Sequence, residues 1–135
     1  MSQKLQKIKS WLQSFDYRLE MGKSDFVVYD LGLVILNPRQ SKKHLVYSAL
    51  HECGHIILAN QKSYNKDFKV LNKANIDGRV MRSDVYKYKQ LREEIEAWEF
   101  GHKLAQSLGI KINKDDYDKY AAKCFKSYVK FYACV

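Results

Sequence analysis

The chain has 135 residues, of which 46% are hydrophobic and one is proline, so it suits a single domain over residues 1–135 and is neither disordered nor of low complexity. No apolar run reaches the roughly 18 residues of a membrane span, and the first residues lack the apolar core of a signal peptide, so we expect a cytoplasmic protein without a membrane partner. The net charge of +9 makes nucleic acid a candidate partner, although the lysines are spread along the chain and form no basic block.

The first predicted elements are one helix and a small sheet. Residues 2–15 carry apolar side chains at helical spacing behind Ser2 as a cap, which predicts a helix. Residues 16–21, 26–30 and 33–37 form three short runs rich in apolar and β-branched residues, separated by turn residues. They predict a three-stranded meander, in which each strand pairs with the next along the chain.

Helices dominate the rest of the chain. Residues 41–60 predict one helix, and residues 83–108 predict a longer one that ends before Gly109. The polar segment 61–82 lies between them and is expected to be irregular, with a short helix or hairpin. Residues 116–132 predict a terminal amphipathic helix. Its apolar stripe consists of Tyr117, Tyr120, Ala121, Cys124, Tyr128, Phe131 and Tyr132. The fold class is therefore α+β.

The stretch LVYSALHECGHIILAN, residues 45–60, places polar side chains inside an apolar helix. His51 and His55 are one helical turn apart on the same face, so both imidazoles can bind one ion. Glu52 lies beside them and can reach a water molecule on that ion. This HExxH pattern predicts a catalytic Zn²⁺ site, in which Glu52 accepts a proton from the water. The alternative is a pair of buried histidines satisfied by hydrogen bonds.

A catalytic zinc site usually has three protein ligands and one open position. Gln61 occupies the position where the HExxHxxGxxH pattern has its third histidine, so we expect a carboxylate from further along the chain. Glu94 is the candidate, because its helix face is small and apolar and should pack inward; Glu93 lines up with that face more weakly. The face consists of Ala97, Trp98, Gly101, Ala105 and Leu108. The alternative for Glu94 is a buried ion pair with Arg79, Arg82 or a lysine.

The segments HECGHIIL and EEIEAWEFGHKLA resemble the two motifs of the glutamate-zincin metallopeptidases, and are most similar to the ImmA/IrrE-type peptidase domain of phages and other mobile elements. The resemblance covers about residues 26–108. It implies a minimal zincin-like fold, in which a small sheet packs beside the HExxH helix and a long glutamate-bearing helix. It also implies that His51, His55 and Glu94 bind zinc and that Glu52 is the catalytic base. A phage or another mobile element is a source that the resemblance suggests, and a cellular source stays open.

Three further side chains are candidates for the second shell of the site or for binding an oxyanion. Tyr47 lies one turn before the first histidine and can offer its hydroxyl to a tetrahedral oxyanion. Trp98 stands where the resembling family usually carries Asn or Asp, and can contact a metal ligand. His102 lies about two turns beyond Glu94 on the same helix. For each of the three, the alternative is a packing role in the core.

Two classes of function follow from these patterns. The first is a zinc metallopeptidase that hydrolyses an intracellular protein or peptide, with a regulator of a mobile element as the target that the resemblance implies. The second is a catalytically silent zincin-fold binding protein, associated with nucleic acid through its positive charge. Glu52 favours the first class, because a structural zinc site fills all four positions and needs no carboxylate beside an open one.

Overall fold

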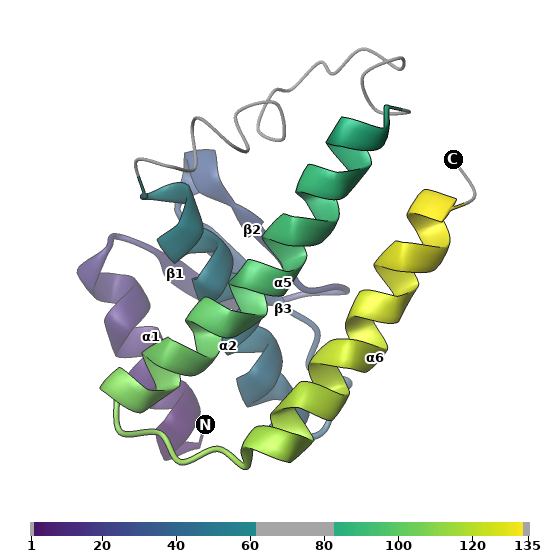
Figure 1. Ribbon diagram of the computed structural model, residues 1–135. Helices are drawn as coiled ribbons and strands as arrows, with labels where there is room; N and C mark the ends of the chain where they lie inside the picture. Colours follow the sequence, from purple (N-terminus) through teal and green to yellow (C-terminus); the bar gives the residue numbers. More distant parts are fainter. Residues whose placement is uncertain (1, 62–82, 134–135) are drawn as a thin grey trace.

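The computed structural model describes residues 2–61 and 83–133. Over these residues the fold is α+β, as predicted, with four α-helices and a small mixed sheet. The elements in chain order are α1 (Gln3–Ser14), β1 (Arg18–Met21), β2 (Phe26–Val28), the 3₁₀ helix η1 (Tyr29–Leu31), β3 (Leu33–Leu36), α2 (Lys42–Ala59), α5 (Asp84–Ser107) and α6 (Lys114–Ala133). In Figure 1, α2 and α5 cross near the centre, α1 lies to one side and α6 to the other. No helix within the described ranges is long and apolar enough to cross a membrane.

The four predicted helices are confirmed, with ends that differ from the expected ones by one or two residues. Three of them begin in the same way, because a serine hydroxyl accepts a hydrogen bond from a backbone N–H of the first turn. These caps are Ser2 on α1, Ser41 on α2 and Ser83 on α5. After α5 the chain turns at Gly109, whose φ of +69° lies in the left-handed region. The irregular segment expected at 61–82 lies, apart from Gln61, outside the described residues.

The sheet has three strands as predicted, but the predicted meander order was wrong. β3 is the central strand, with β1 parallel on one side and β2 antiparallel on the other. The central place suits β3 because it is wholly apolar, and its Val34 and Leu36 are fully buried. β1 carries exposed Arg18 and Glu20, which suit an edge strand. η1 and Gly32, with φ +58°, join β2 to β3 in a short hairpin.

Helix α6 docks on the rest of the molecule through its first half. Tyr117 is buried there, and its hydroxyl donates a hydrogen bond of 2.6 Å to the backbone carbonyl of Trp98 on α5. Cys124 is the last residue of α6 that packs against the core. The predicted apolar stripe was wrong at Tyr128 and Phe131, which are 36% and 60% exposed, because the second half of α6 extends beyond the core.

Two glycines let the backbones of α2 and α5 touch. A Cβ atom placed on Gly54 of α2 would overlap the carbonyl oxygen of Ala97, and one placed on Gly101 of α5 would lie 2.5 Å from the carbonyl oxygen of Leu50. Neither glycine leaves room for a side chain, so the two helices pack at the closest distance that their backbones allow. Glu94 precedes Ala97 by three residues, so this contact brings its carboxylate to the histidine face of α2.

We predict that Gly54→Ala destabilises the protein by about 1–3 kcal/mol, because the added methyl group forces α2 away from α5. The sign is informative, since the same change inside an ordinary helix would stabilise it by about 1 kcal/mol. Chemical denaturation of wild type and variant measures the difference in free energy of unfolding. A variant that is as stable as wild type, or more stable, would show that the helices do not pack this closely.

Candidate metal centre

The two histidines of the HExxH pattern converge from one face of α2. His51 is 7% exposed, and the Nε2 atoms of His51 and His55 lie 3.1 Å apart. Their rings are inclined at 65° to each other, in an edge-to-face arrangement. The two Nε2 atoms therefore face a shared space between the rings.

The carboxylate of Glu94 on α5 reaches both of these nitrogens. One of its oxygens lies 2.9 Å from Nε2 of His51 and the other lies 3.3 Å from Nε2 of His55. Glu94 is 7% exposed, so all three groups meet in a nearly dry environment. The partners considered above as alternatives, Arg79 and Arg82, lie outside the described residues.

The spacing of these three groups fits a zinc ion. Ligand atoms about 2.0–2.1 Å from zinc in tetrahedral geometry are roughly 3.3 Å from one another. The observed separations are 2.9, 3.1 and 3.3 Å. Small movements of the three side chains would therefore be enough to place their ligand atoms around a zinc ion. Two imidazole nitrogens and a carboxylate oxygen are also among the donors that zinc takes in catalytic sites.

Glu52 lies beside the three groups but approaches His51 from another side. Its Oε1 is 3.5 Å from Nδ1 of His51, the ring nitrogen opposite the one that faces His55. A carboxylate oxygen of Glu52 and one nitrogen from each histidine lie within 4.8 Å of one another, so Glu52 is itself close enough to be a ligand. Glu94 is the better candidate for a third ligand because its oxygens contact the Nε2 atoms of both histidines.

Glu93 and Trp98, both on α5, hold the two imidazole rings. Nδ1 of His55 donates a hydrogen bond of 3.2 Å to the carboxylate of Glu93. The ring of Trp98 stacks on the ring of His51 with centroids 4.1 Å apart and planes within 9°. Such contacts orient metal ligands from outside, so the structure places Trp98 next to a candidate ligand, as the sequence analysis suggested.

The structure does not bring Tyr47 or His102 to this cluster. The hydroxyl of Tyr47 donates a hydrogen bond of 2.9 Å to Asp116, in a separate cavity near the start of α6. The ring of His102 packs beside the ring of Tyr117, with centroids 5.7 Å apart. Neither side chain lines the cavity in front of the histidines. Tyr47 on α2 and His102 on α5 both contact residues of α6 instead.

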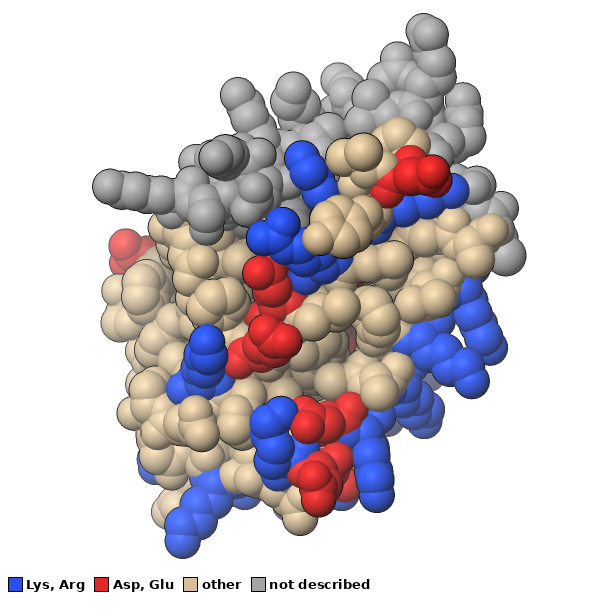
Figure 2. Space-filling model, in the orientation of Figure 1, with Lys and Arg blue, Asp and Glu red and all other residues tan. Residues whose placement is uncertain are grey.

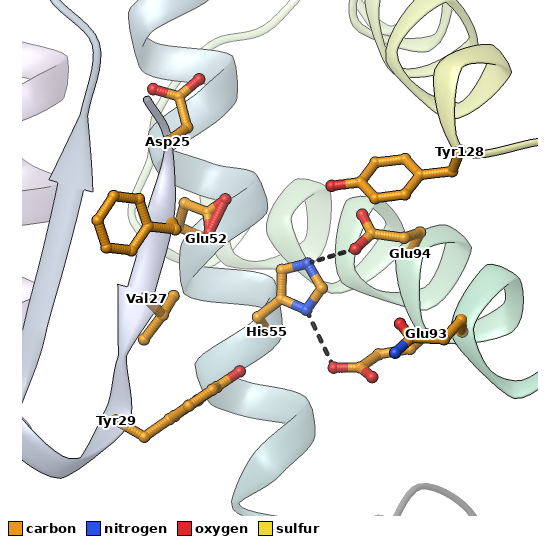
Figure 3. A pocket seen from close by; sticks show the side chains of 10 residues that line it. Asp25, Val27, Tyr29, Glu52, His55, Glu93, Glu94 and Tyr128 are labelled. Atoms are coloured by element: carbon orange, nitrogen blue, oxygen red, sulfur yellow. Dashed lines mark hydrogen bonds and ion pairs between the residues drawn. The ribbon is translucent and has the colours of Figure 1, made fainter. Parts of the chain in front are cut away.

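A cavity of about 230 Å³ opens in front of His55 and Glu52. Figure 3 shows it between β2 on one side and α5 and α6 on the other, with the dashed contacts from His55 to Glu93 and Glu94 at its floor. Its lining residues are Asp25, Phe26, Val27, Tyr29, Glu52, His55, Gln90, Glu93, Glu94 and Tyr128. His55 and Glu94 are thus accessible from outside.

The carboxylates and imidazoles shift one another's pKa. Burial by itself raises the pKa of Glu94, but hydrogen bonds from His51 and His55 outweigh it and lower that pKa to about 2. Burial by itself lowers the pKa of His55, but its hydrogen bonds to Glu93 and Glu94 hold the pKa well above the usual value. The pKa of His51 is raised too, because Glu52 and Glu94 outweigh its burial. Without metal, the cluster therefore holds protons on the histidines.

Asp25 and Tyr128 line the cavity but were not singled out from sequence as site residues, and Glu93 was weighed only as a weaker candidate than Glu94. The doubled glutamate at 93 and 94 was a usable signal for Glu93, since neighbouring helical residues can flank one partner. Asp25 accepts hydrogen bonds from the backbone N–H of Asn37 and from the amide of Gln40, which ties the start of β2 to the end of β3. For Tyr128 no sequence signal existed, because its position depends on how α6 docks.

We predict that Glu94→Gln weakens zinc binding by more than about 100-fold, whereas Glu93→Gln weakens it by about 10- to 100-fold. Glu94 would lose a ligand oxygen that carries charge, while Glu93 only orients His55. Glu99→Gln is the matched control, because Glu99 is an exposed glutamate on the same helix. Competition with a chelating dye measures the affinities. Equal zinc affinity in Glu94→Gln and Glu99→Gln would rule out Glu94 as a ligand.

We also predict that zinc binding releases protons at neutral pH. Zinc requires unprotonated imidazoles, and the raised pKa values of His51 and His55 keep protons there at higher pH than in free histidine. Zinc affinity should therefore fall on acidification and rise with pH until the histidines have lost their protons. Glu94 contributes no proton, since its pKa is about 2. Titration calorimetry in buffers of different ionisation enthalpy counts the protons; affinity that is constant from about pH 6 to about pH 8 would contradict this.

Comparison of the chain with protein-family models, with curated proteins and with solved structures finds no match. The resemblance to glutamate zincins therefore rests on the two sequence motifs.

Proposed function

We propose that the chain is a zinc-dependent peptidase with a minimal zincin-like fold, which hydrolyses peptide bonds of an intracellular protein. The observation that carries the proposal is the convergence of His51, His55 and Glu94 at 2.9–3.3 Å, with the carboxylate of Glu52 on the wall of the adjoining cavity. His51, His55 and Glu94 would hold zinc, and Glu52 would be the general base.

Each side chain of the site has a defined task in this proposal. Zinc held by the three ligands would polarise a carbonyl group and make water more acidic. Glu52 would take the proton from the attacking water and deliver it to the leaving amine. Glu93 and Trp98 would keep the imidazoles of His55 and His51 in position through the hydrogen bond and ring contact that they already make.

The wall that β2 forms favours an extended peptide as the substrate. Among the described strands β2 pairs with β3 alone, so its other edge has backbone groups that can bind another strand. Phe26 and Val27 of β2 line the cavity. A peptide lying along this edge would pass in front of Glu52 and His55. An edge of this kind binds backbone groups, which every peptide has.

The charge distribution gives less support to nucleic acid as a partner. Figure 2 shows one face of the molecule, on which Lys and Arg side chains are dispersed and acidic side chains lie between them. The cavity itself carries four carboxylates, from Asp25, Glu52, Glu93 and Glu94, and these would repel phosphate groups. The net charge of +9 therefore has no visible link to this site.

We predict that Glu52→Gln retains zinc but lowers the rate of peptide cleavage at least about 100-fold, because the amide cannot accept the proton from water. Zinc content is measured on the purified variant, and cleavage is followed with fluorescently labelled denatured casein. Glu99→Gln is the control and should match wild type in both measurements.

Two results would contradict the proposal in different ways. Loss of zinc in Glu52→Gln would make Glu52 a fourth ligand, as in a closed structural site. Cleavage at the wild-type rate by Glu52→Gln, or no cleavage by the zinc-loaded wild type, would favour a catalytically silent binding protein.

A further inference from the structure

We propose that the hydroxyl of Tyr128 on α6 is a catalytic hydrogen-bond donor of this site, which stabilises the negative charge that develops on the carbonyl oxygen of a bound peptide. The inference rests on the proposed peptidase function. It adds a residue from a helix that neither zinc motif includes.

The position of Tyr128 is the first argument. Its side chain lines the same cavity as Glu52, His55 and Glu94, although it stands more than 30 positions beyond Glu94 in the sequence. Figure 3 shows its hydroxyl pointing into the cavity from α6, towards the space between the carboxylates of Glu52 and Glu94. A group bound at the candidate metal ligands would lie within this space.

The supply of hydrogen-bond donors at the cavity is the second argument. The ionised carboxylates there can only accept hydrogen bonds. The ring nitrogens of His55 already face Glu93, Glu94 and His51, and one of the two amide N–H groups of Gln90 donates to the hydroxyl of Tyr86. The hydroxyl of Tyr128, in contrast, has no hydrogen-bond partner among the described residues. It is therefore available to a ligand.

The surroundings of Tyr128 on α6 give no packing reason for this side chain. The residues of α6 beyond Cys124 lie outside the hydrophobic core, and Tyr128, Val129 and Phe131 are 36%, 42% and 60% exposed. Tyr128 nevertheless points towards the acidic cavity. Burial, followed by the charges of Glu94 and Glu52, raises its pKa above the ordinary value of 10.0, so its hydroxyl keeps the proton at neutral pH.

The chemical step needs such a donor. When the water oxygen bonds to the carbonyl carbon, an electron pair of the C=O double bond moves onto the carbonyl oxygen. The O–H of Tyr128 would donate a hydrogen bond to that oxygen without giving up its proton. The electron pair then returns to carbon as the C–N bond breaks, and the amine leaves with the proton that Glu52 took from water.

The test compares zinc-loaded wild type with Tyr128→Phe, using denatured casein as substrate. Loss of the hydroxyl should lower kcat by about 100- to 1000-fold with little change in KM, which is the typical cost of removing one oxyanion donor. Zinc affinity and thermal stability should not change. Tyr132→Phe is the matched control, one turn further along α6 and outside the cavity lining, and it should behave like wild type.

A second readout does not depend on turnover. A phosphinic peptide carries a tetrahedral anion that resembles the tetrahedral intermediate of peptide hydrolysis, and it should bind Tyr128→Phe more weakly than wild type by a similar factor. A peptide of the same sequence made of D-amino acids is the control and should bind wild type and variant equally. If wild type cleaves casein and Tyr128→Phe equals it in kcat and in phosphinic peptide affinity, the assignment of Tyr128 falls and the peptidase function stands. If Tyr29→Phe alone reduces both quantities, the donor is Tyr29. If wild type neither cleaves nor binds, both proposals fall together.

Discussion

The backbone contact between α2 and α5 is the constraint on which the rest of the structure depends. Gly54 lies between the two histidines of α2 in the sequence, and Ala97, whose carbonyl it meets, follows Glu94 by three residues. A side chain larger than hydrogen at position 54 would separate the two helices, and the carboxylate of Glu94 would no longer reach both Nε2 atoms. The same residue thus serves the packing of the fold and the spacing of the candidate ligands.

The electrostatics of the cluster explain why a cation suits it. Glu52, Glu93 and Glu94 are each no more than 7% exposed, and they surround two imidazoles. Burying several carboxylates is costly unless opposite charge accompanies them. Protons on His51 and His55 supply that charge in the metal-free protein, which agrees with the raised pKa of both histidines. A divalent cation would replace the protons and use the same lone pairs.

Much of the fold could be predicted because its signals are local. Serine caps and helical spacing of apolar residues identify α1, α2 and α5. Helix geometry alone places two histidines four residues apart on one face. Glu94 could be chosen by the same reasoning, since its helix face is small and apolar. The strand order could not be predicted, because β1 pairs in parallel with β3 and not with β2, the next strand in the sequence.

Contacts between distant segments limited the prediction of the site in the same way. Tyr47 is on the correct helix, but its hydroxyl turns to Asp116, which α6 supplies. Tyr128 reaches the cavity because of the angle at which α6 docks, and no periodicity along the chain encodes that angle. Glu93 and Glu94 are adjacent, yet they contact opposite nitrogens of His55, which depends on where α2 crosses α5.

The most direct test of the central claim is a crystal structure of the protein grown with zinc, with anomalous difference maps recorded on both sides of the zinc absorption edge. The account predicts one strong peak about 2 Å from Nε2 of His51, from Nε2 of His55 and from a carboxylate oxygen of Glu94. A peak bound elsewhere, or a peak at the histidines with the side chain of Glu94 turned away to solvent, would contradict it.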